Sequence, residues 1–144
     1  MAGRGGVAVI DIAVLRDVAR HARECFPEEC CGYLTDTTVV RCTNAQASGL
    51  HPTTPERGPE TGFVIAGAEL FAFARSFDGP SPARTVYHSH TNGRAYLSQV
   101  DREVGVGYPV QHLVVGVTAD AVTEAALFDR DFVEIARWRG EVLG

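Results

Sequence analysis

The sequence predicts a mixed α/β domain, because segments with helical spacing and short strand-like apolar runs alternate along its 144 residues. The chain is 45% hydrophobic, which at this length is enough for a real core. We find no internal repeat and no linker-like stretch, so we expect one domain spanning residues 1–144.

The first part of the chain is expected to form a strand and a helix. Residues 7–10 are a short apolar run of strand length. In residues 12–25 the apolar positions recur at helical spacing, and Asp11 is placed to cap the N-terminus. Pro27 then ends the helix, since proline cannot continue it.

The rest of the chain continues this alternation. Residues 31–34 and 38–42 are expected to pair as strands, and residues 47–62, rich in Gly, Pro, Ser and Thr, are the longest loop candidate. The apolar segment 63–65 precedes a second helix over 68–77. The remaining expected elements are strands at 84–88, 113–117, 125–128 and 132–136 and a short helix at 98–104.

Charge and cysteine content argue against several classes of protein. The formal net charge is −5, and the 13 basic residues, all arginine, are scattered among 18 acidic ones, so no basic stripe indicates nucleic-acid binding. No apolar stretch approaches the roughly 20 residues that cross a bilayer. The polar start is unlike a secretory signal, so we expect a cytoplasmic protein. Its four cysteines are then expected to be reduced thiols rather than a disulfide framework.

Two short motifs carry the chemistry: His-Ser-His at 88–90 and Ser-Gln-Val-Asp at 98–101. Two histidines two residues apart at a strand end project to one face, so both imidazoles can reach one ion. A catalytic zinc site has three protein ligands, ordinarily imidazole nitrogens and carboxylate oxygens, and one open position. His88, His90 and Asp101 supply that number. Ser98, three residues before Asp101, shares its helix face.

Each motif also has an ordinary structural interpretation. Ser98 followed by Asp101 is typical of a helix start, with Ser98 as the N-cap and Asp101 near the positive end of the helix dipole. The two interpretations are compatible, because a serine that caps a helix can also face a metal. A His-x-His pair alone is weak evidence, so the indication of a metal site comes from the combination.

The combination of His-x-His, seven residues and Ser-x-x-Asp resembles the motif of the JAMM metallopeptidases, also called MPN+ domains. Residues 27–32, Pro-Glu-Glu-Cys-Cys-Gly, are similar to the Pro-x-Glu-x-Cys-Gly stretch of bacterial members, and they align the family's glutamate with Glu29. The resemblance extends over nearly the whole chain and includes Asn44, the segment 63–65 and the Tyr-Pro pair at 108–109.

The resemblance implies a cytidine-deaminase-like MPN fold, a mixed sheet flanked by helices. It implies one zinc ion at one end of the central strands, held by His88, His90 and Asp101. Two positions depart from the family pattern: Thr91 and Leu97 stand where members often have proline. Neither position supplies a ligand, but proline stiffens a loop, so the rigidity of this loop is left open.

Catalytic roles are also implied by the resemblance. Glu29 would accept a proton from the attacking water and pass it to the leaving group, and Ser98 would hydrogen-bond the oxyanion. Glu28 is the alternative base. Neighbouring residues of an extended chain face opposite ways, so only one of the two glutamates should face the site.

JAMM enzymes cut the bond after the C-terminal glycine of a ubiquitin-fold protein, and short bacterial members resemble enzymes that act on sulfur-carrier proteins. The expected function is therefore zinc-dependent hydrolysis at the Gly-Gly tail of such a carrier, by trimming the tail or releasing cysteine or another amino acid. Two alternatives stay open. One is a deconjugating isopeptidase that removes a ubiquitin-like protein from its targets, and the other is a non-catalytic MPN scaffold.

Overall fold

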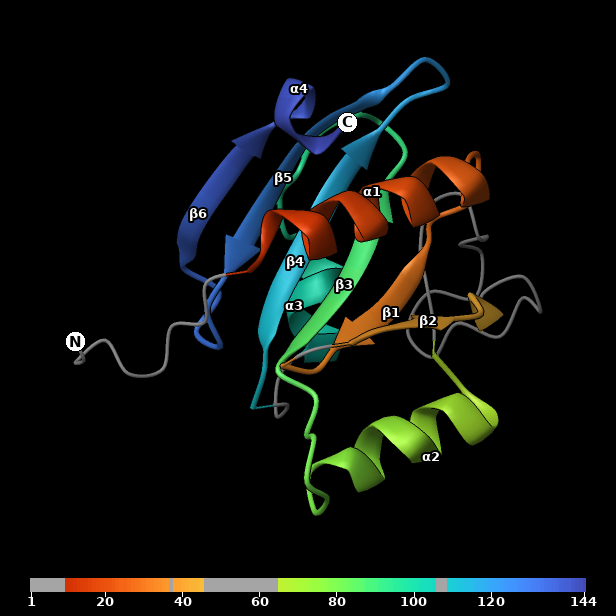
Figure 1. Ribbon diagram of the computed structural model, residues 1–144, viewed down its shortest axis with the longest axis vertical. Coiled ribbons are helices and arrows are strands. Elements are labelled where there is room, and N and C mark those ends of the chain that lie inside the picture. Colours follow the sequence, from red (N-terminus) through yellow and green to blue (C-terminus); the bar gives the residue numbers. More distant parts are fainter. Residues whose placement is uncertain (1–9, 37, 46–64, 106–108) are drawn as a thin grey trace.

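The computed structural model describes residues 10–36, 38–45, 65–105 and 109–144. Figure 1 shows a twisted six-stranded sheet with helices on both of its faces. The strands are β1 (Cys31–Leu34), β2 (Val39–Cys42), β3 (Thr85–His90), β4 (Gln111–Val117), β5 (Val122–Phe128) and β6 (Glu134–Arg139). The helices are α1 (Ile12–Cys25), α2 (Gly67–Ser76), α3 (Gln99–Gly105) and α4 (Gly140–Leu143). The mixed α/β class is confirmed.

The sheet has the order β2-β1-β3-β4-β5-β6, and its one parallel pair is β3 with β4. Strands β1 and β3 pair antiparallel, with Cys31 opposite His88. A parallel pair needs a crossover, and the connection through α3 provides it. This crossover begins at the end of β3 that holds the two histidines, so α3 starts beside them.

Helix α1 forms where the amphipathic pattern predicted it, with the predicted bounds. The Asp11 carboxylate accepts a 2.8 Å hydrogen bond from the Ala13 N–H, which satisfies one of the open amides of the first turn. Its apolar stripe is buried against one face of the sheet, where Leu15 and Val18 share a core with Tyr87 of β3. Because this stripe covers one face of the sheet, the polar site has to lie on the other face.

The opposite face of the sheet is covered by several shorter segments (Figure 1). Phe73 of α2 packs in a cluster with Tyr33 of β1, and the loop between β3 and α3 packs Ala95 and Leu97 against β4 and β5. Directly paired residues of neighbouring strands share a face, so His88 shares this face with Val114 of β4. The histidine motif therefore lies on the face away from α1.

Several boundaries differ from those expected. Strand β3 continues to His90, so His90 also lies inside the strand, which was expected to end at His88. The expected strand at 132–136 begins only at Glu134, because Phe132 has a left-handed φ of 68°. The Asp129 carboxylate holds this turn by accepting from the Val133 N–H at 3.0 Å. The short helix α4 was not predicted.

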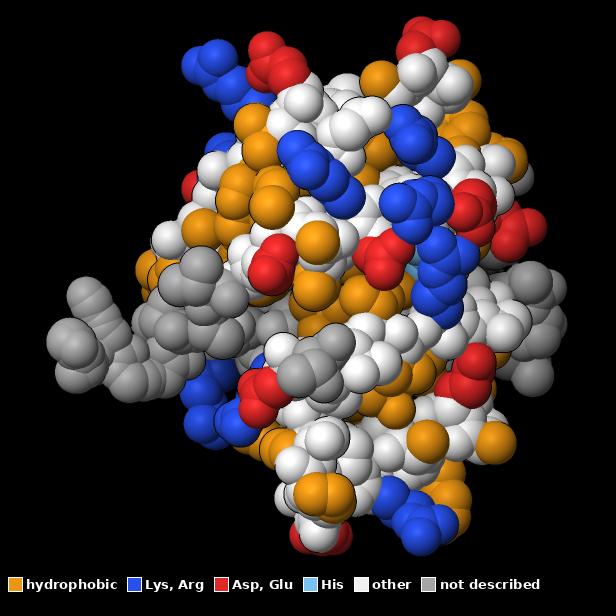
Figure 2. Space-filling model, viewed as in Figure 1, with side chains coloured by type: hydrophobic (Ala, Val, Ile, Leu, Met, Phe, Trp, Pro, Cys, Tyr) orange, Lys and Arg blue, Asp and Glu red, His pale blue; other side chains and the backbone are white. Residues whose placement is uncertain are grey.

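Some expectations fall outside the described residues. They concern most of the strand at 7–10, the loop at 47–62 and most of the segment 63–65. Among the described residues, none of the helices is both long and apolar enough to span a bilayer. On the face that Figure 2 shows, arginine and acidic side chains are interspersed, as the scattered charges of the sequence indicate.

Candidate metal centre

Two ligand atoms of the candidate centre come from neighbouring positions on one face of β3. His88 and His90 are two residues apart, and their side chains are only 4% and 7% exposed. Their Nε2 atoms lie 3.2 Å apart, so both rings point to one place rather than side by side into solvent. This is the arrangement that the His-x-His spacing predicts.

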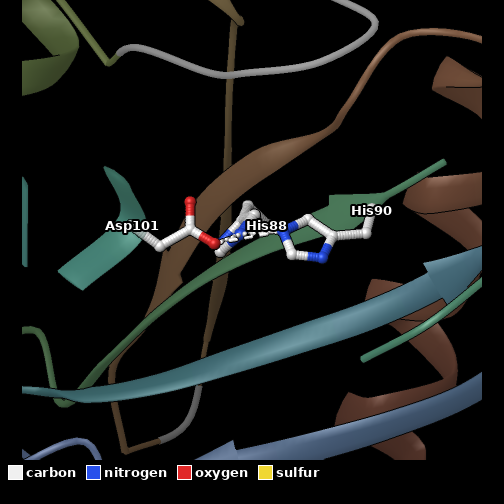
Figure 3. Close-up of side chains that lie close together, drawn as sticks. All are labelled: His88, His90 and Asp101. Atoms are coloured by element: carbon white, nitrogen blue, oxygen red, sulfur yellow. Dashed lines mark hydrogen bonds and ion pairs between the residues drawn. The ribbon is translucent and has the colours of Figure 1, made fainter. Parts of the chain in front are cut away.

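The third ligand atom comes from the first turn of α3. The Oδ2 atom of Asp101 lies 3.1 Å from the Nε2 atom of His88 and 3.1 Å from that of His90. Figure 3 shows the carboxylate and the two rings pointing toward one another. In the described part of the chain this is the one group of three or more His, Cys, Asp or Glu side chains whose ligand atoms all lie within 4.8 Å.

Ser98 fixes the position of Asp101. The Asp101 N–H donates to the Ser98 hydroxyl at 3.0 Å, and the Ser98 N–H donates to Asp101 Oδ2 at 2.9 Å. This reciprocal pair is a capping box, so the capping interpretation of the motif is confirmed. The same carboxylate oxygen that caps the helix points to the histidines, so capping and metal binding are compatible here.

The spacing of the three ligand atoms fits a tetrahedral ion. Zinc with bonds of about 2.0 Å to its ligands has about 3.3 Å between ligand atoms in a regular tetrahedron. The three observed separations are 3.2, 3.1 and 3.1 Å. His88, His90 and Asp101 would thus occupy three corners of such a tetrahedron, leaving the fourth for water or substrate.

The electrostatics of the site also favour a cation. Burial alone would raise the pKa of Asp101, but the charge and hydrogen bonds of His88 and His90 outweigh it and hold that pKa well below its usual range. Burial lowers the pKa of His90, which favours its neutral ring. His90 Nδ1 lies 3.3 Å from the Arg94 carbonyl, which only accepts, so a proton on Nδ1 would form this hydrogen bond and leave Nε2 free to bind a metal. The lone pair of His90 Nε2 then faces a carboxylate, an arrangement that a metal ion stabilises.

The two candidate bases differ sharply in burial. Glu29 is 4% exposed, whereas Glu28 is exposed. Cys31 pairs with His88, so alternation along the chain places Glu29, two residues earlier, on the face of the histidines. The Glu29 carbonyl accepts from the Asn44 amide at 3.0 Å. The next residue, Cys30, donates its N–H at 2.8 Å to the hydroxyl of Ser89, the residue between the two histidines in the sequence.

All four cysteines are free thiols, and three of them are buried. Burial is the main cause that raises the pKa of Cys30 to about 12 and that of Cys42 to about 11. A cysteine nucleophile needs a lowered pKa, so neither Cys30 nor Cys42 is suited to a thiolate mechanism.

His112 of β4 is a further buried histidine on the metal-facing side of the sheet. It pairs with Val86, two residues before His88, and is 7% exposed. Its Nε2 atom has no hydrogen-bond partner among the residues that the structure describes. Burial is the main cause that lowers the pKa of His112 to about 4, with a smaller contribution from His88. The folded protein therefore holds this ring neutral.

This shift predicts a loss of stability in acid. The unfolded chain binds a proton at His112 near the ordinary pKa of 6.5, whereas the folded chain binds it only near 4, so protonation favours unfolding between these values. Between about pH 7 and pH 5 the contribution is about 2 kcal/mol at most. Urea unfolding at both pH values should show a smaller acid loss in His112→Gln. An identical loss in this variant would show that His112 is not responsible.

The fold and the site together define an α/β domain with a candidate three-ligand metal centre. A family profile described as Prok-JAB, prokaryotic homologs of the JAB domain, matches residues 11–128. The chain belongs to this prokaryotic JAB family of MPN domains, as the motifs indicated.

Several solved structures have a similar fold. A protein from Desulfitobacterium hafniense has a TM-score of 0.56 at 20% identity, over 84% of each chain. A JAB1/MPN domain protein from Archaeoglobus fulgidus has a TM-score of 0.50 at 12% identity, over 87% of this chain and 92% of its own. A protein from Salinibacter ruber has a TM-score of 0.50 at 23% identity, over 88% and 84%. At these identities the likeness shows the fold alone. No curated protein matches the chain.

Proposed function

We propose that this chain is a zinc-dependent hydrolase that cleaves after the C-terminal glycine of a ubiquitin-fold sulfur-carrier protein. The observation that carries the proposal is the convergence of two imidazole nitrogens and one carboxylate oxygen at tetrahedral spacing, from side chains that are at most 7% exposed. Three protein ligands with an open fourth position favour a catalytic centre over a structural one, which would be closed by a fourth protein ligand.

Zinc held by His88, His90 and Asp101 would supply Lewis-acid chemistry, polarising the scissile carbonyl and lowering the pKa of a water molecule. The other steps belong to the chain. Glu29, buried on the same face, would take the proton of the attacking water and deliver it to the leaving amine. The Arg94 carbonyl, 3.3 Å from His90 Nδ1, would keep the His90 proton on that nitrogen, so that Nε2 remains available as a ligand atom.

Ser98 can both cap α3 and stabilise an oxyanion. Its hydroxyl oxygen accepts the Asp101 N–H at 3.0 Å, and a hydroxyl that accepts can still donate its own proton. That proton would be directed to the oxyanion that forms as water attacks the carbonyl.

Ser98→Gly is expected to separate these two roles. Glycine is tolerated at an N-cap at a cost of a few tenths of a kcal/mol, so stability and zinc content should barely change. Loss of one oxyanion donor should lower kcat by about 10²–10³-fold. Steady-state hydrolysis and thermal unfolding measure the two effects, with Ser98→Thr as the variant that keeps the hydroxyl. A kcat equal to that of wild type would leave Ser98 as a cap alone.

A Gly-Gly tail is a suitable substrate for a site at this place in the sheet. Strand β2 is an edge of the described sheet. Its Cys42 pairs with Cys31, and Cys31 pairs with His88, so this part of the edge lies level with His88. The free backbone groups of an edge strand can bind an extended peptide, and glycine passes where larger side chains would clash. We therefore propose that the carrier tail lies extended along this edge and presents its last glycine bond to the metal.

The test uses the full chain and a ubiquitin-fold carrier protein with residues added after its Gly-Gly end. Zinc content is measured by elemental analysis, and cleavage by the mass of the released carrier. We expect about one zinc ion per chain, cleavage directly after the second glycine, and loss of cleavage on chelation that added zinc restores. A chain that stays metal-free when zinc is supplied and leaves the carrier intact would overturn the proposal.

A further inference from the structure

The loop between β3 and α3, residues 91–98, joins two metal ligands to the third. It runs from His90 to the start of the helix that carries Asp101, so its shape determines how these ligands meet. Its backbone lies directly on the sheet. A Cβ atom on Gly116 of β4 would come within 2.6 Å of the Gly93 carbonyl, and the Thr123 hydroxyl donates to that same carbonyl. The loop lacks the stiffening prolines, so contacts such as these must hold it.

One peptide unit of this loop connects His90 to an acidic residue of β5. The carbonyl of Arg94 lies 3.3 Å from His90 Nδ1, where it can accept a hydrogen bond from the ring N–H. The N–H of the same peptide unit, which belongs to Ala95, donates to Glu124 Oε2 at 2.8 Å. The carboxylate of Glu124 is thus linked to the His90 ring through a single, planar peptide group.

Arg137 of β6 completes the arrangement from the other side. Its Nη1 atom lies 3.0 Å from Glu124 Oε1, and its Nη2 atom donates to the Ala95 carbonyl at 3.0 Å. Both backbone groups of Ala95 are therefore held by this ion pair, and Ala95 is 1% exposed. Arg137 also pairs with Glu134 at 2.6 Å, and in the described part of the chain Glu134 hydrogen-bonds Arg137 and not the loop.

We propose that Glu124 is a positioning residue for the metal centre, acting on His90 through the Arg94–Ala95 peptide, with Arg137 holding both Glu124 and the loop. Metal-binding histidines commonly donate their second ring N–H to a carboxylate or carbonyl, which orients the ring and makes it a better ligand. Here the Arg94 carbonyl is positioned to accept from the histidine ring. The Glu124 carboxylate accepts from the N–H of the same peptide unit, which polarises the peptide and makes its carbonyl a stronger acceptor.

The partial exposure of the ion pair supports a positioning role over a stabilising one. The side chains of Arg137 and Glu124 are 40% and 31% exposed, and ion pairs so open to solvent contribute little to stability. Their removal should therefore leave the fold intact and change the geometry at His90. This inference rests on the zinc site of the proposed function.

The test measures zinc affinity by chelator competition in Glu124→Ala, Glu124→Gln and the matched control Glu134→Gln. Loss of such a supporting partner lowers metal affinity about 10–100-fold, and we expect about 10-fold for Glu124→Ala because it acts through a peptide. Glu124→Gln keeps an oxygen for the Ala95 N–H but loses the charge, so its affinity should be intermediate. Glu134→Gln, which breaks only the other ion pair of Arg137, should match wild type within about twofold.

A spectroscopic measurement separates positioning from a general loss of structure. In the zinc-loaded protein, the Nδ1–H resonance of His90 should move or broaden in Glu124→Ala, whereas it should stay in place in Glu134→Gln. If Glu124→Ala does not fold, Glu124→Gln is compared with the control in its place. Unchanged affinity in the Glu124 variants, or equal losses in the control, would overturn the inference. Wild-type protein that binds no zinc would instead overturn the proposed function on which it rests.

Discussion

Asp101→Ala is expected to remove zinc from the protein and with it all zinc-dependent hydrolysis. Asp101 supplies the only carboxylate among the three converging ligand atoms, and its Oδ2 atom lies 3.1 Å from both histidine nitrogens. Without it, two neutral imidazoles would have to hold a divalent ion with no compensating negative charge. A catalytic zinc site ordinarily has three protein ligands, so two are not expected to retain the ion through purification.

Elemental analysis and hydrolysis of the extended carrier test this prediction. Asp101→Asn is the informative second variant, because its amide oxygen can still accept the Ser98 N–H that caps α3 but carries no charge. We expect it to melt close to wild type while binding zinc far more weakly. Asp120→Ala, at an exposed position, is the matched control and should keep about one zinc ion per chain. Zinc retained in both Asp101 variants would contradict the proposed ligand set.

Glu29→Gln is expected to keep zinc and lose catalysis. Glutamine has nearly the shape of glutamate but cannot accept the proton of an attacking water. General acid–base catalysis by a positioned side chain contributes about 10²–10⁴-fold, so kcat should fall by that factor. The zinc content should stay at the wild-type value, because Glu29 is not one of the three converging ligand atoms.

The adjacent residue provides the control for this prediction. Glu28 is exposed whereas Glu29 is 4% exposed, so Glu28→Gln should hydrolyse the carrier at the wild-type rate. Single-turnover rates and zinc analysis of both variants separate the chemical step from metal binding. A large loss in Glu28→Gln with full activity in Glu29→Gln would reverse the assignment and make Glu28 the base.

Much of the candidate site could be predicted because its motifs are local. The spacing of His88 and His90 places both on one face of any strand, whatever its neighbours. Ser98 and Asp101 form a capping box within one helical turn, which depends on no distant contact. Alternation along the chain alone predicts that only one of the two glutamates faces the histidines. Which of them does so depends on the pairing of β1 with β3.

The residues that support the ligands were not predicted. Glu124 and Arg137 carry no local pattern that distinguishes them from surface charges, and they lie far along the chain from Ala95, whose two backbone groups they bind. Asn44 belonged to the resemblance, but its hydrogen bond to the Glu29 carbonyl follows only from the way the chain folds back after β2. That His112 Nε2 has no hydrogen-bond partner among the described residues likewise depends on what packs around β4.

The sequence by itself determined the helix α1 with its Asp11 cap, the kinds of side chain in the site, and the common face of His88 and His90, because periodicity and capping act within a few residues. Only the tertiary structure decided that Asp101 reaches the two histidines. That meeting requires the parallel pairing of β3 with β4 and a loop held by β5 and β6. Strand order and register depend on contacts between distant segments, and local spacing does not encode the partner that each segment finds.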